Sequence, residues 1–257
     1  LADEYINKKV RFGHWKDTAI KIEGDAVQSF TMMFLQMWNI TERQPEDYAK
    51  YLTEKQPGFS RKDGYIIPYG DSPFDHENVR EEVYFHILNH AKKYVHIMTP
   101  YLILDNEMLT TLIRAAKSGI EVIIIMPHIP DKWYAFAVAK TYYKELIEGG
   151  VQIYEYTPGF VHAKVFVSDD DTATVGSINL DFRSLYLHFE NGGFTESEKI
   201  SKSSVFFVSF FRSRPGAEGG ITVPVRRRSG SGLRGPAGPP SAACALFSAG
   251  SGFRWRC

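Results

Sequence analysis

Short apolar segments alternate with longer segments of helical periodicity through most of residues 64–168. The segment IEVIIIMP (120–127) is a continuous apolar run, which is typical of a strand buried on both faces of a sheet. Glycine directly follows the helical segments on either side of it, at Gly119 and Gly149, as is common where helices end. Strands that alternate with helices predict an α/β sandwich, in which a mixed β-sheet is flanked by helices.

Periodicity and boundary residues place the expected elements along the chain. The expected strands are short and rich in β-branched or aromatic residues, and they cover residues 18–24, 64–70, 94–100, 120–127, 151–157, 161–168 and 172–177. The expected helices have apolar residues at helical spacing, and they cover residues 25–39, 76–93, 106–119 and 132–150. Asp25 is expected to cap the first helix, and residues 45–63 to form a connection with one short helix.

Composition excludes one class of partner and sets the last part of the chain apart. The 257 residues include thirty basic and thirty acidic ones, so no overall positive field favours nucleic acid as a partner. Residues 195–257 differ in character, since from Pro215 onward they are rich in glycine, proline, alanine and arginine, with Glu218 as the only acid. This composition predicts a mostly disordered tail. The tail is either native, with basic residues that would contact an anionic membrane, or an out-of-frame extension.

The segment FVHAKVFVSDDDTATVGSINLDF predicts a β-hairpin whose turn lies at SDDDT. Alternate side chains of a strand share a face, so His162 and Lys164 point to the same side. The returning strand then brings Ser177 and Asn179 opposite these two residues. An ammonium, a hydroxyl and an amide beside an imidazole predict an anion-binding site at one end of the hairpin.

Two further residues of this segment have different expected roles. Gly176 allows the backbone to approach closely whatever binds there. Asp169 lies seven residues beyond His162, which is roughly 20 Å along an extended strand at about 3.3 Å per residue. We therefore expect Asp169 to be structural, accepting hydrogen bonds from turn amides or pairing with a nearby base.

These six residues are spaced H-x-K-x4-D-x6-G-S-x-N, which is the complete signature of the phospholipase D superfamily. Six fixed positions match by chance at roughly 10⁻⁸ per starting position, so coincidence is not an adequate explanation. Segments such as PYGDSPFDHENVREEVYFHILNHAKKYVHIMTPYLILDNEMLTTLIRAAKSGIEVIIIMPHIPDKW extend the likeness. Over about residues 1–190 the chain resembles bacterial cardiolipin synthases.

The resemblance implies a phospholipase D-like fold and a specific reaction. One phosphatidylglycerol donates its phosphatidyl group to another through a phosphohistidine, giving cardiolipin and glycerol. It implies that His162 is the general acid and that Lys164, Ser177 and Asn179 hold the phosphoryl oxygens. Neither a cofactor nor a metal is implied. The implied partners are phosphatidylglycerol, other anionic phospholipids and the bacterial cytoplasmic membrane surface.

The resemblance also assigns two carboxylates. Glu190 stands where the family has the carboxylate that orients a signature histidine, and we expect it to belong to this copy of the signature. Asp17 is expected to have oriented the histidine of a first copy. The H-x-K spacing at His14 is a decoy, because Lys21 stands where the aspartate should be and no Gly-Ser-x-Asn follows.

The chain departs from the family in its organisation. Members carry two copies of the signature and an N-terminal membrane anchor, whereas we expect this sequence to be a C-terminal half that holds the second copy. We expect residues 1–60 to be a remnant of the first domain with its connection, and residues 61–194 to be the second domain. Residues 195–257 then stand in place of the family's closing strands and helix.

One signature makes half a site, so we expect activity to require a homodimer or the missing N-terminal half. Two alternatives stay open. One is another phospholipase D-type phosphodiesterase, either a lipid hydrolase or a dimeric nuclease. The other is an inactive fragment that binds anionic lipid. Four further histidines match no ligand pattern, and they are His86, His90, His96 and His128.

Overall fold

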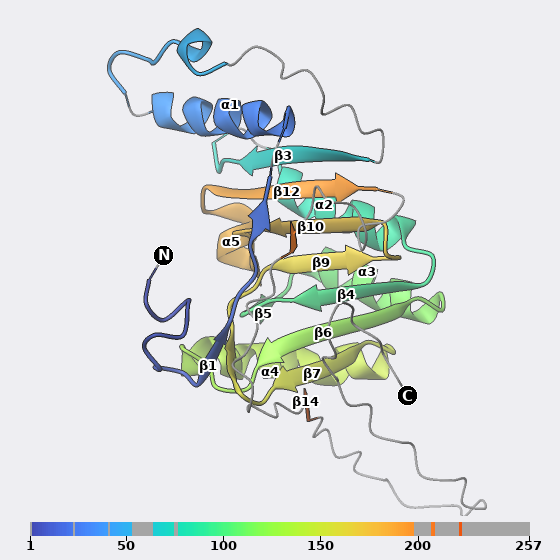
Figure 1. Ribbon diagram of the computed structural model, residues 1–257. Helices are drawn as coiled ribbons and strands as arrows, with labels where there is room; N and C mark the ends of the chain where they lie inside the picture. Colours follow the sequence, from blue (N-terminus) through green and yellow to red (C-terminus); the bar gives the residue numbers. More distant parts are fainter. Residues whose placement is uncertain are drawn as a thin grey trace, which may run out of the picture.

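A computed structural model describes residues 2–22, 24–40, 42–52, 64–74 and 77–197, together with two short strands at 207–208 and 221–222. Its centre is a mixed sheet in the order β14-β7-β6-β4-β9-β10-β12-β3 (Figure 1). Strands β4, β6 and β7 are parallel to one another, and the other pairings are antiparallel. The strands of this sheet are β3 (Tyr65–Asp71), β4 (Tyr94–Met98), β6 (Glu121–Pro127), β7 (Gln152–Tyr156), β9 (Val165–Ser168), β10 (Thr172–Gly176), β12 (Glu190–Glu196) and β14 (Ile221–Thr222).

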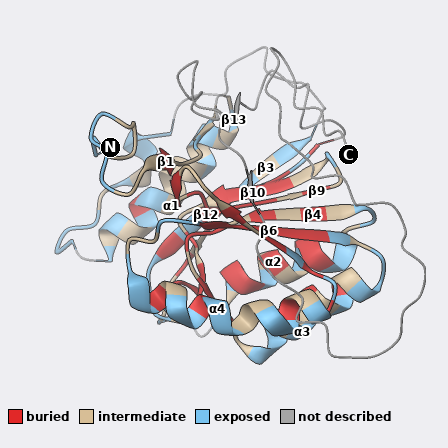
Figure 2. Ribbon diagram, turned by 90° about the horizontal axis from the view of Figure 1, so that it is seen from below, coloured by how far each residue is buried: buried red, intermediate tan, exposed pale blue. Residues whose placement is uncertain are grey.

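Helices flank the sheet, which confirms the predicted fold class. Three of them cover one face, and they are α2 (Val79–His90), α3 (Asn106–Lys117) and α4 (Trp133–Glu148) (Figure 2). On the other side α1 (Ala26–Asn39) packs against β3, where the side chain of Met33 lies close to Gly70. The shorter helices are η1 (Tyr48–Lys50) and α5 (Phe182–Tyr186).

Local sequence explains where several helices begin and end. The Asp105 carboxylate accepts a hydrogen bond of 2.7 Å from the amide of Met108 and caps α3. Gly119, which follows α3, has a φ of 93°, a conformation that glycine adopts without strain. The predicted cap of α1 is wrong, because the side chain of Asp25 makes no capping hydrogen bond within the described residues. Its backbone is already helical, with φ −60° and ψ −31°, whereas a capping residue is normally extended.

The sheet is apolar on both faces, as the continuous run in β6 predicts. Ile124 and Met126 belong to the main core between the sheet and α2–α4. Ile123 and Ile125 belong to a smaller cluster on the opposite face, with Val161 and residues of the β9–β10 hairpin. Alternate side chains of one strand therefore enter two different clusters.

The first part of the chain packs directly on this domain. Strand β1 (His14–Lys16) pairs in parallel with β8 (Gly159–Val161), and β2 (Ile20–Lys21) pairs with β13 (Phe207–Val208). The strand expected at 161–168 is therefore divided into β8 and β9, with residues 162–164 between them. A further parallel pair that the sequence did not predict joins β5 (Leu102–Ile103) to β11 (Leu180–Asp181).

The sheet continues slightly beyond the expected domain boundary. Strand β12 runs to Glu196, and Thr195, the first residue of the expected tail, is buried. Within the expected tail the structure also describes the short strands β13 and β14, and the predicted disorder otherwise falls on residues outside the described ranges. Among the helices of the described part of the chain, none is both long and apolar enough to span a bilayer.

Candidate active site

Several strands end or begin together at one end of the sheet. Met98, the last residue of β4, pairs with Val165, the first residue of β9. In the same way Asp71, at the end of β3, pairs with Glu190, at the start of β12. The C-terminal ends of β6 and β7 meet at the same end. We call this the pocket end of the sheet, because the carboxyl ends of parallel strands are where α/β folds commonly bind ligands.

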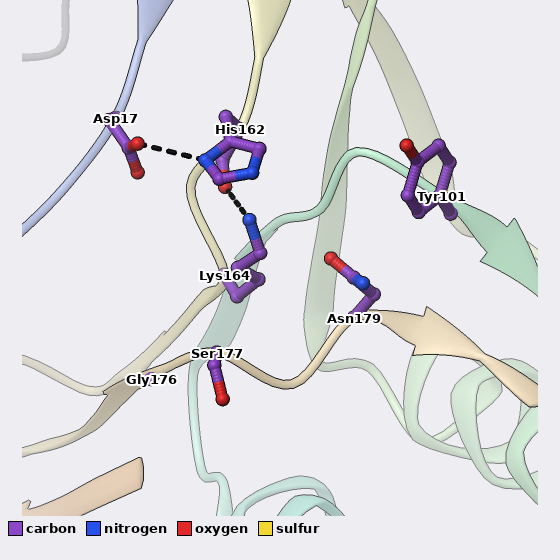
Figure 3. Close-up of a pocket in the computed structure, with 7 residues that line it drawn as sticks. All are labelled: Asp17, Tyr101, His162, Lys164, Gly176, Ser177 and Asn179. Atoms are coloured by element: carbon purple, nitrogen blue, oxygen red, sulfur yellow. Dashed lines mark hydrogen bonds and ion pairs between the residues drawn. The ribbon is translucent and has the colours of Figure 1, made fainter. Parts of the chain in front are cut away.

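A pocket of about 350 Å³ lies at the pocket end (Figure 3). The β9–β10 hairpin builds one wall: Ser168 pairs with Thr172, Val165 with Val175, and the Gly176 amide donates to the Lys164 carbonyl over 3.3 Å. The hairpin brings the imidazole, the ammonium, the hydroxyl and the amide of the signature to one place, as its alternation and turn predict. The residues that line the pocket are Asp17, Tyr101, His162, Lys164, Gly176, Ser177 and Asn179.

Asp17 orients His162, which corrects the expected pairing of this carboxylate. Its Oδ2 lies 2.8 Å from His162 Nδ1. The reason is the parallel pairing of β1 with β8, because the carbonyl of Lys16 accepts hydrogen bonds from the amides of His162 and Ala163 at 2.7 and 3.2 Å. The residue that follows β1 must therefore lie beside the residue that follows β8. In Figure 3 the other ring nitrogen of His162 points away from Asp17, towards the side of Asn179.

The surroundings favour the charged form of Asp17. Burial by itself raises the pKa of Asp17, but the hydrogen bond and charge of His162, with the charge of Lys164, outweigh it and hold this pKa below its ordinary value. The rings of Trp15 and Tyr5 lie against the imidazole, with centroids 5.0 and 5.1 Å away. The carboxylate and these rings together fix the orientation of His162.

Lys164 is a buried cation inside the pocket. Its side chain donates from Nζ to the carbonyl of His162, and the residue is 9% exposed. Burial lowers the pKa of Lys164 to about 8, although Asp17 and Glu190 act in the opposite direction. A partly desolvated ammonium of this kind attracts an anionic ligand more strongly than an exposed lysine does.

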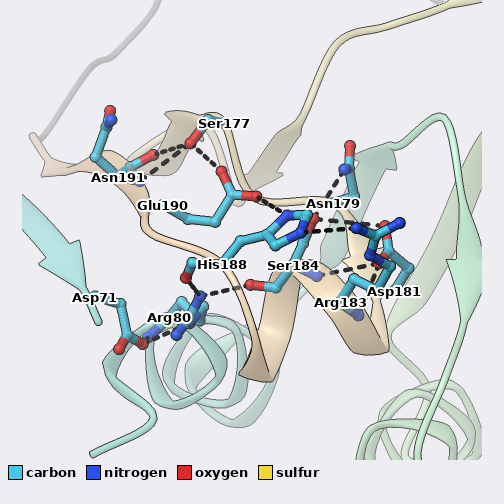
Figure 4. A network of polar contacts seen from close by, with 10 residues as sticks. All are labelled: Asp71, Arg80, Ser177, Asn179, Asp181, Arg183, Ser184, His188, Glu190 and Asn191. Atoms are coloured by element: carbon cyan, nitrogen blue, oxygen red, sulfur yellow. Dashed lines mark hydrogen bonds and ion pairs between the residues drawn. The ribbon is translucent and has the colours of Figure 1, made fainter. Parts of the chain in front are cut away.

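Glu190 lies beside Ser177 rather than His162, which corrects its expected role towards this histidine. The Ser177 hydroxyl donates to Glu190 Oε2, and Oε1 lies 3.8 Å from His188 Nδ1 (Figure 4). The amide of Asn191 donates to Ser177 Oγ over 3.0 Å. The reason is again the register, since β12 pairs with β10 and so its first residue lies next to the end of the hairpin.

Asn179 is held by α5. Its Nδ2 donates to Ser184 Oγ over 2.9 Å, while its Oδ1 is buried and has no hydrogen-bond partner among the described residues. Asp181 caps α5 by accepting from the amides of Arg183 and Ser184 at 2.9 and 3.1 Å. The short helix therefore fixes the amide that the signature places in the pocket.

Arg80, which the sequence alone does not single out, holds the segment that connects α5 to β12. Its Nε lies 2.7 Å from Asp71 Oδ2, and its Nη1 donates to the carbonyls of Ser184 and His188 at 2.7 and 2.5 Å (Figure 4). The side chain is almost fully buried. The sequence does place an arginine in the first turn of a helix that follows a strand ending in aspartate. This pattern is too common to identify one residue by itself.

Asp169 does not reach the pocket. Its carboxylate accepts hydrogen bonds from the amides of Lys92, Lys93 and Tyr94 at 2.6, 2.9 and 3.0 Å. Burial raises the pKa of Asp169, but these three hydrogen bonds outweigh that effect and lower it below the ordinary value. The residue ties the hairpin turn to the start of β4. His14 also lies outside the pocket, with Nδ1 2.9 Å from the hydroxyl of Tyr156.

Comparison with known proteins assigns the family. Residues 84–205 match the model of a protein family described as "Cardiolipin synthase, PLD-like domain". The cardiolipin synthase of Alkalihalophilus pseudofirmus is 33% identical over 227 residues, covering 84% of this chain and 45% of the relative. Cardiolipin synthase 2 of Bacillus anthracis is 38% identical over 203 residues, covering 79% and 39%.

Two further matches complete the comparison. An uncharacterized protein of Streptococcus mutans serotype c is 60% identical over 190 residues, covering 74% of this chain and 41% of that protein. The chain thus spans less than half the length of these curated relatives. The phospholipase D family member Nuc of Salmonella typhimurium aligns with a TM-score of 0.44 at 18% identity, over 52% of this chain and 84% of Nuc. The chain therefore carries, over residues 84–205, a phospholipase D-like domain of the cardiolipin synthase type.

Proposed function

We propose that this chain supplies one half of the active site of a cardiolipin synthase, which transfers a phosphatidyl group between two phosphatidylglycerol molecules. The observation that carries the proposal is the pairing of His162 with Asp17 in the lining of a pocket that Lys164 and Asn179 also line. A histidine oriented by a carboxylate is suited to proton transfer, and the cation and amide beside it are suited to a phosphodiester.

In the first step, the histidine of a second signature attacks phosphorus, so that a phosphorus–nitrogen bond forms. The bond between phosphorus and the oxygen of the headgroup glycerol breaks. His162, in its protonated form, gives its proton to that oxygen, and glycerol leaves. Asp17 stabilises the imidazolium before the transfer. Lys164 and Asn179 hold the phosphoryl oxygens, on which negative charge grows.

In the second step, His162 takes the proton from a hydroxyl of the acceptor phosphatidylglycerol. That oxygen attacks phosphorus, the phosphorus–nitrogen bond breaks, and cardiolipin leaves.

With water as the acceptor the same groups would hydrolyse the lipid, so a lipid hydrolase is the nearest alternative function. A nuclease is disfavoured by the zero net charge of the chain, and an inactive lipid-binding fragment is the remaining alternative.

The second signature would come from a second copy of this chain or from a separate N-terminal half. Glu190 lies outside the pocket lining and does not orient His162, because its buried carboxylate accepts a hydrogen bond from Ser177, which does line the pocket. We propose that Glu190, through Ser177, positions the part of the pocket that the incoming half would meet. The site would then work at the bacterial cytoplasmic membrane, where both substrates reside.

The test is incubation of the purified chain with labelled phosphatidylglycerol in mixed micelles, alone and with a separately produced first half. We expect cardiolipin and glycerol in one of these two mixtures, and loss of both products in His162→Ala. His96→Ala is the matched control, since His96 lies on β4 and contacts Glu121 outside the pocket. Phosphatidic acid in place of cardiolipin would support the hydrolase, and no product in either mixture would reject both activities.

A further inference from the structure

We propose that the pocket end of the sheet docks on an anionic lipid bilayer through exposed aromatic side chains on both sides of the pocket. We call these residues the aromatic rim, and its members are Phe74, Trp133, Tyr134, Phe182 and Phe189. The inference rests on the proposed function, because it assumes that the substrate is a membrane lipid. It adds which surface of the molecule meets the membrane.

The first part of the rim lies where β3 ends and β12 begins. Phe74 is 75% exposed and follows β3, while Phe189 is also exposed and directly precedes β12. Asp71 and Glu190 pair across these two strands, and the rings of Phe74 and Phe189 meet edge to face at 5.7 Å. The two phenyl rings therefore form one apolar projection on this side of the pocket.

The second part lies at the C-terminal end of β6. Trp133 is 78% exposed at the first position of α4, and Tyr134 beside it is 56% exposed, with the two rings nearly perpendicular at 6.1 Å. In the sheet order, β4, β9 and β10 lie between β6 and the pair β12 and β3. The pocket is therefore flanked by aromatic residues over about five strand spacings, or roughly 24 Å at 4.8 Å each.

The third part joins the rim to the signature itself. Phe182 opens α5 three residues after Asn179, and half of it is exposed, with its ring 4.7 Å from that of Tyr186. Figure 1 shows α5 on the side of the sheet where the arrowheads of β4 and β6 also lie. Large apolar side chains exposed together around a pocket mark a binding surface more often than scattered ones do.

Charge beside two parts of the rim, at Trp133 and at Phe182, favours an anionic partner. Lys132 precedes Trp133, Arg183 follows Phe182, and both cations are exposed. The acids of the same two segments are used internally: Asp131 accepts a hydrogen bond of 2.7 Å from Tyr101, and Asp181 accepts from the backbone of α5. The outward charge of these segments is therefore positive, although the whole chain is neutral.

This combination fits a bilayer better than a protein surface. Tryptophan and tyrosine favour the headgroup region of membranes, phenylalanine enters the acyl boundary, and lysine or arginine pairs with anionic headgroups. The pocket would then face the membrane directly. A phosphatidylglycerol headgroup could reach His162 while its acyl chains stay in the bilayer.

The test measures binding of the purified chain to sedimented vesicles of phosphatidylcholine, with and without 30% phosphatidylglycerol. We expect binding only to the anionic vesicles. Phe74→Ala combined with Trp133→Ala should weaken it by about tenfold or more, since each change removes a large apolar anchor. The matched control is Tyr65→Ala, an aromatic residue that is half exposed at the opposite end of β3. Circular dichroism melts should show that all variants stay folded.

Fluorescence gives a second readout. Vesicles with brominated acyl chains should quench the wild-type chain more than Trp133→Phe. Absence of binding, equal binding by the rim variant and the wild type, or equal binding to neutral vesicles would overturn the proposal. A rim variant that keeps vesicle binding but no longer associates with the first half would show a protein interface instead, which also overturns it. Vesicle binding needs no turnover, so a chain that binds but gives no product either alone or with the first half would reject the proposed function and leave the docking inference standing.

Discussion

At the scale of single residues, the site depends on how two side chains with ordinary chemistry are held. His162 is oriented by Asp17 and by flanking aromatic rings, and Lys164 is buried beside it. Neither arrangement follows from residue type. An unoriented imidazole samples several rotamers, whereas the ring of His162 is held in one position. An exposed lysine is charged at all relevant pH values, whereas the pKa of Lys164 is lowered.

Asp17→Asn should reduce phosphatidyl transfer by roughly 10²–10⁴-fold in the mixture that contains both signatures, because the amide cannot stabilise the imidazolium. The nitrogen chemical shift of His162 Nδ1, measured by NMR on the chain alone, should move in the same variant, because the hydrogen-bond partner of this atom changes. Asp25→Asn is the control, since that carboxylate is exposed and does not line the pocket. Unchanged transfer and an unchanged Nδ1 signal in Asp17→Asn would show that the pair has no role.

Binding of a soluble phosphodiester, such as glycerophosphoglycerol, should weaken as pH rises through about 8. The sign follows from the lowered pKa of Lys164, which loses its positive charge in this range, while the diester keeps a single negative charge. Titration calorimetry between pH 6.5 and 9.5 measures the effect. Lys164→Met should bind weakly with no such pH dependence, and a wild-type affinity that stays constant to pH 9.5 would contradict the assignment.

At the scale of elements, α2 determines where the C-terminal part of the pocket wall lies. Arg80 at the start of this helix contacts Asp71 at the end of β3 and the carbonyls of Ser184 and His188 around the end of α5. The segment between Asn179 and Glu190 is therefore fixed to a strand and a helix that precede it by about a hundred residues. A buried ion pair of this kind contributes more to the position of the segment than to net stability.

Arg80→Met should lower the free energy of unfolding by about 3–5 kcal/mol, because it leaves the Asp71 carboxylate buried without its cation. Denaturant titration measures the loss. The double variant Arg80→Met with Asp71→Asn should recover part of it. Arg114→Met, which removes an exposed arginine that contacts Asn89, should change stability by less than about 0.5 kcal/mol. Equal effects of the two single variants would contradict this account.

At the scale of the whole molecule, the site is assembled from both ends of the described chain. Strand β1 supplies Asp17 from a segment that the resemblance assigns to a preceding domain, yet it pairs with β8 in the middle of this one. The contact is close, because a Cβ on Gly159 would lie 2.4 Å from backbone atoms of His14. The N-terminal segment is therefore part of the site and cannot be regarded as a passive connection.

Gly159→Val should separate β1 from β8 and release Asp17 from His162, since backbone atoms cannot move aside as a flexible side chain can. We expect the Nδ1 signal of His162 to move as in Asp17→Asn, with a fold that persists because the main core does not include β1. NMR of the imidazole and a thermal melt test both statements. Thr110→Val on the exposed side of α3 is the control, and a wild-type Nδ1 signal in Gly159→Val would reject the role given to this pairing.

The sequence by itself determined the α/β class, the β9–β10 hairpin and the meeting of His162 and Lys164 with Ser177 and Asn179, because these depend on periodicity and on contacts close along the chain. It also placed Asp169 away from the pocket, since strand length alone separates it from His162. Only the tertiary structure decided which carboxylate orients His162. Asp17 lies 145 residues away, and its position follows from the parallel pairing of β1 with β8, which no local pattern encodes. The sequence also did not determine the burial of Lys164 or the contacts of Arg80. Desolvation and long-range hydrogen bonds exist only once distant elements have packed.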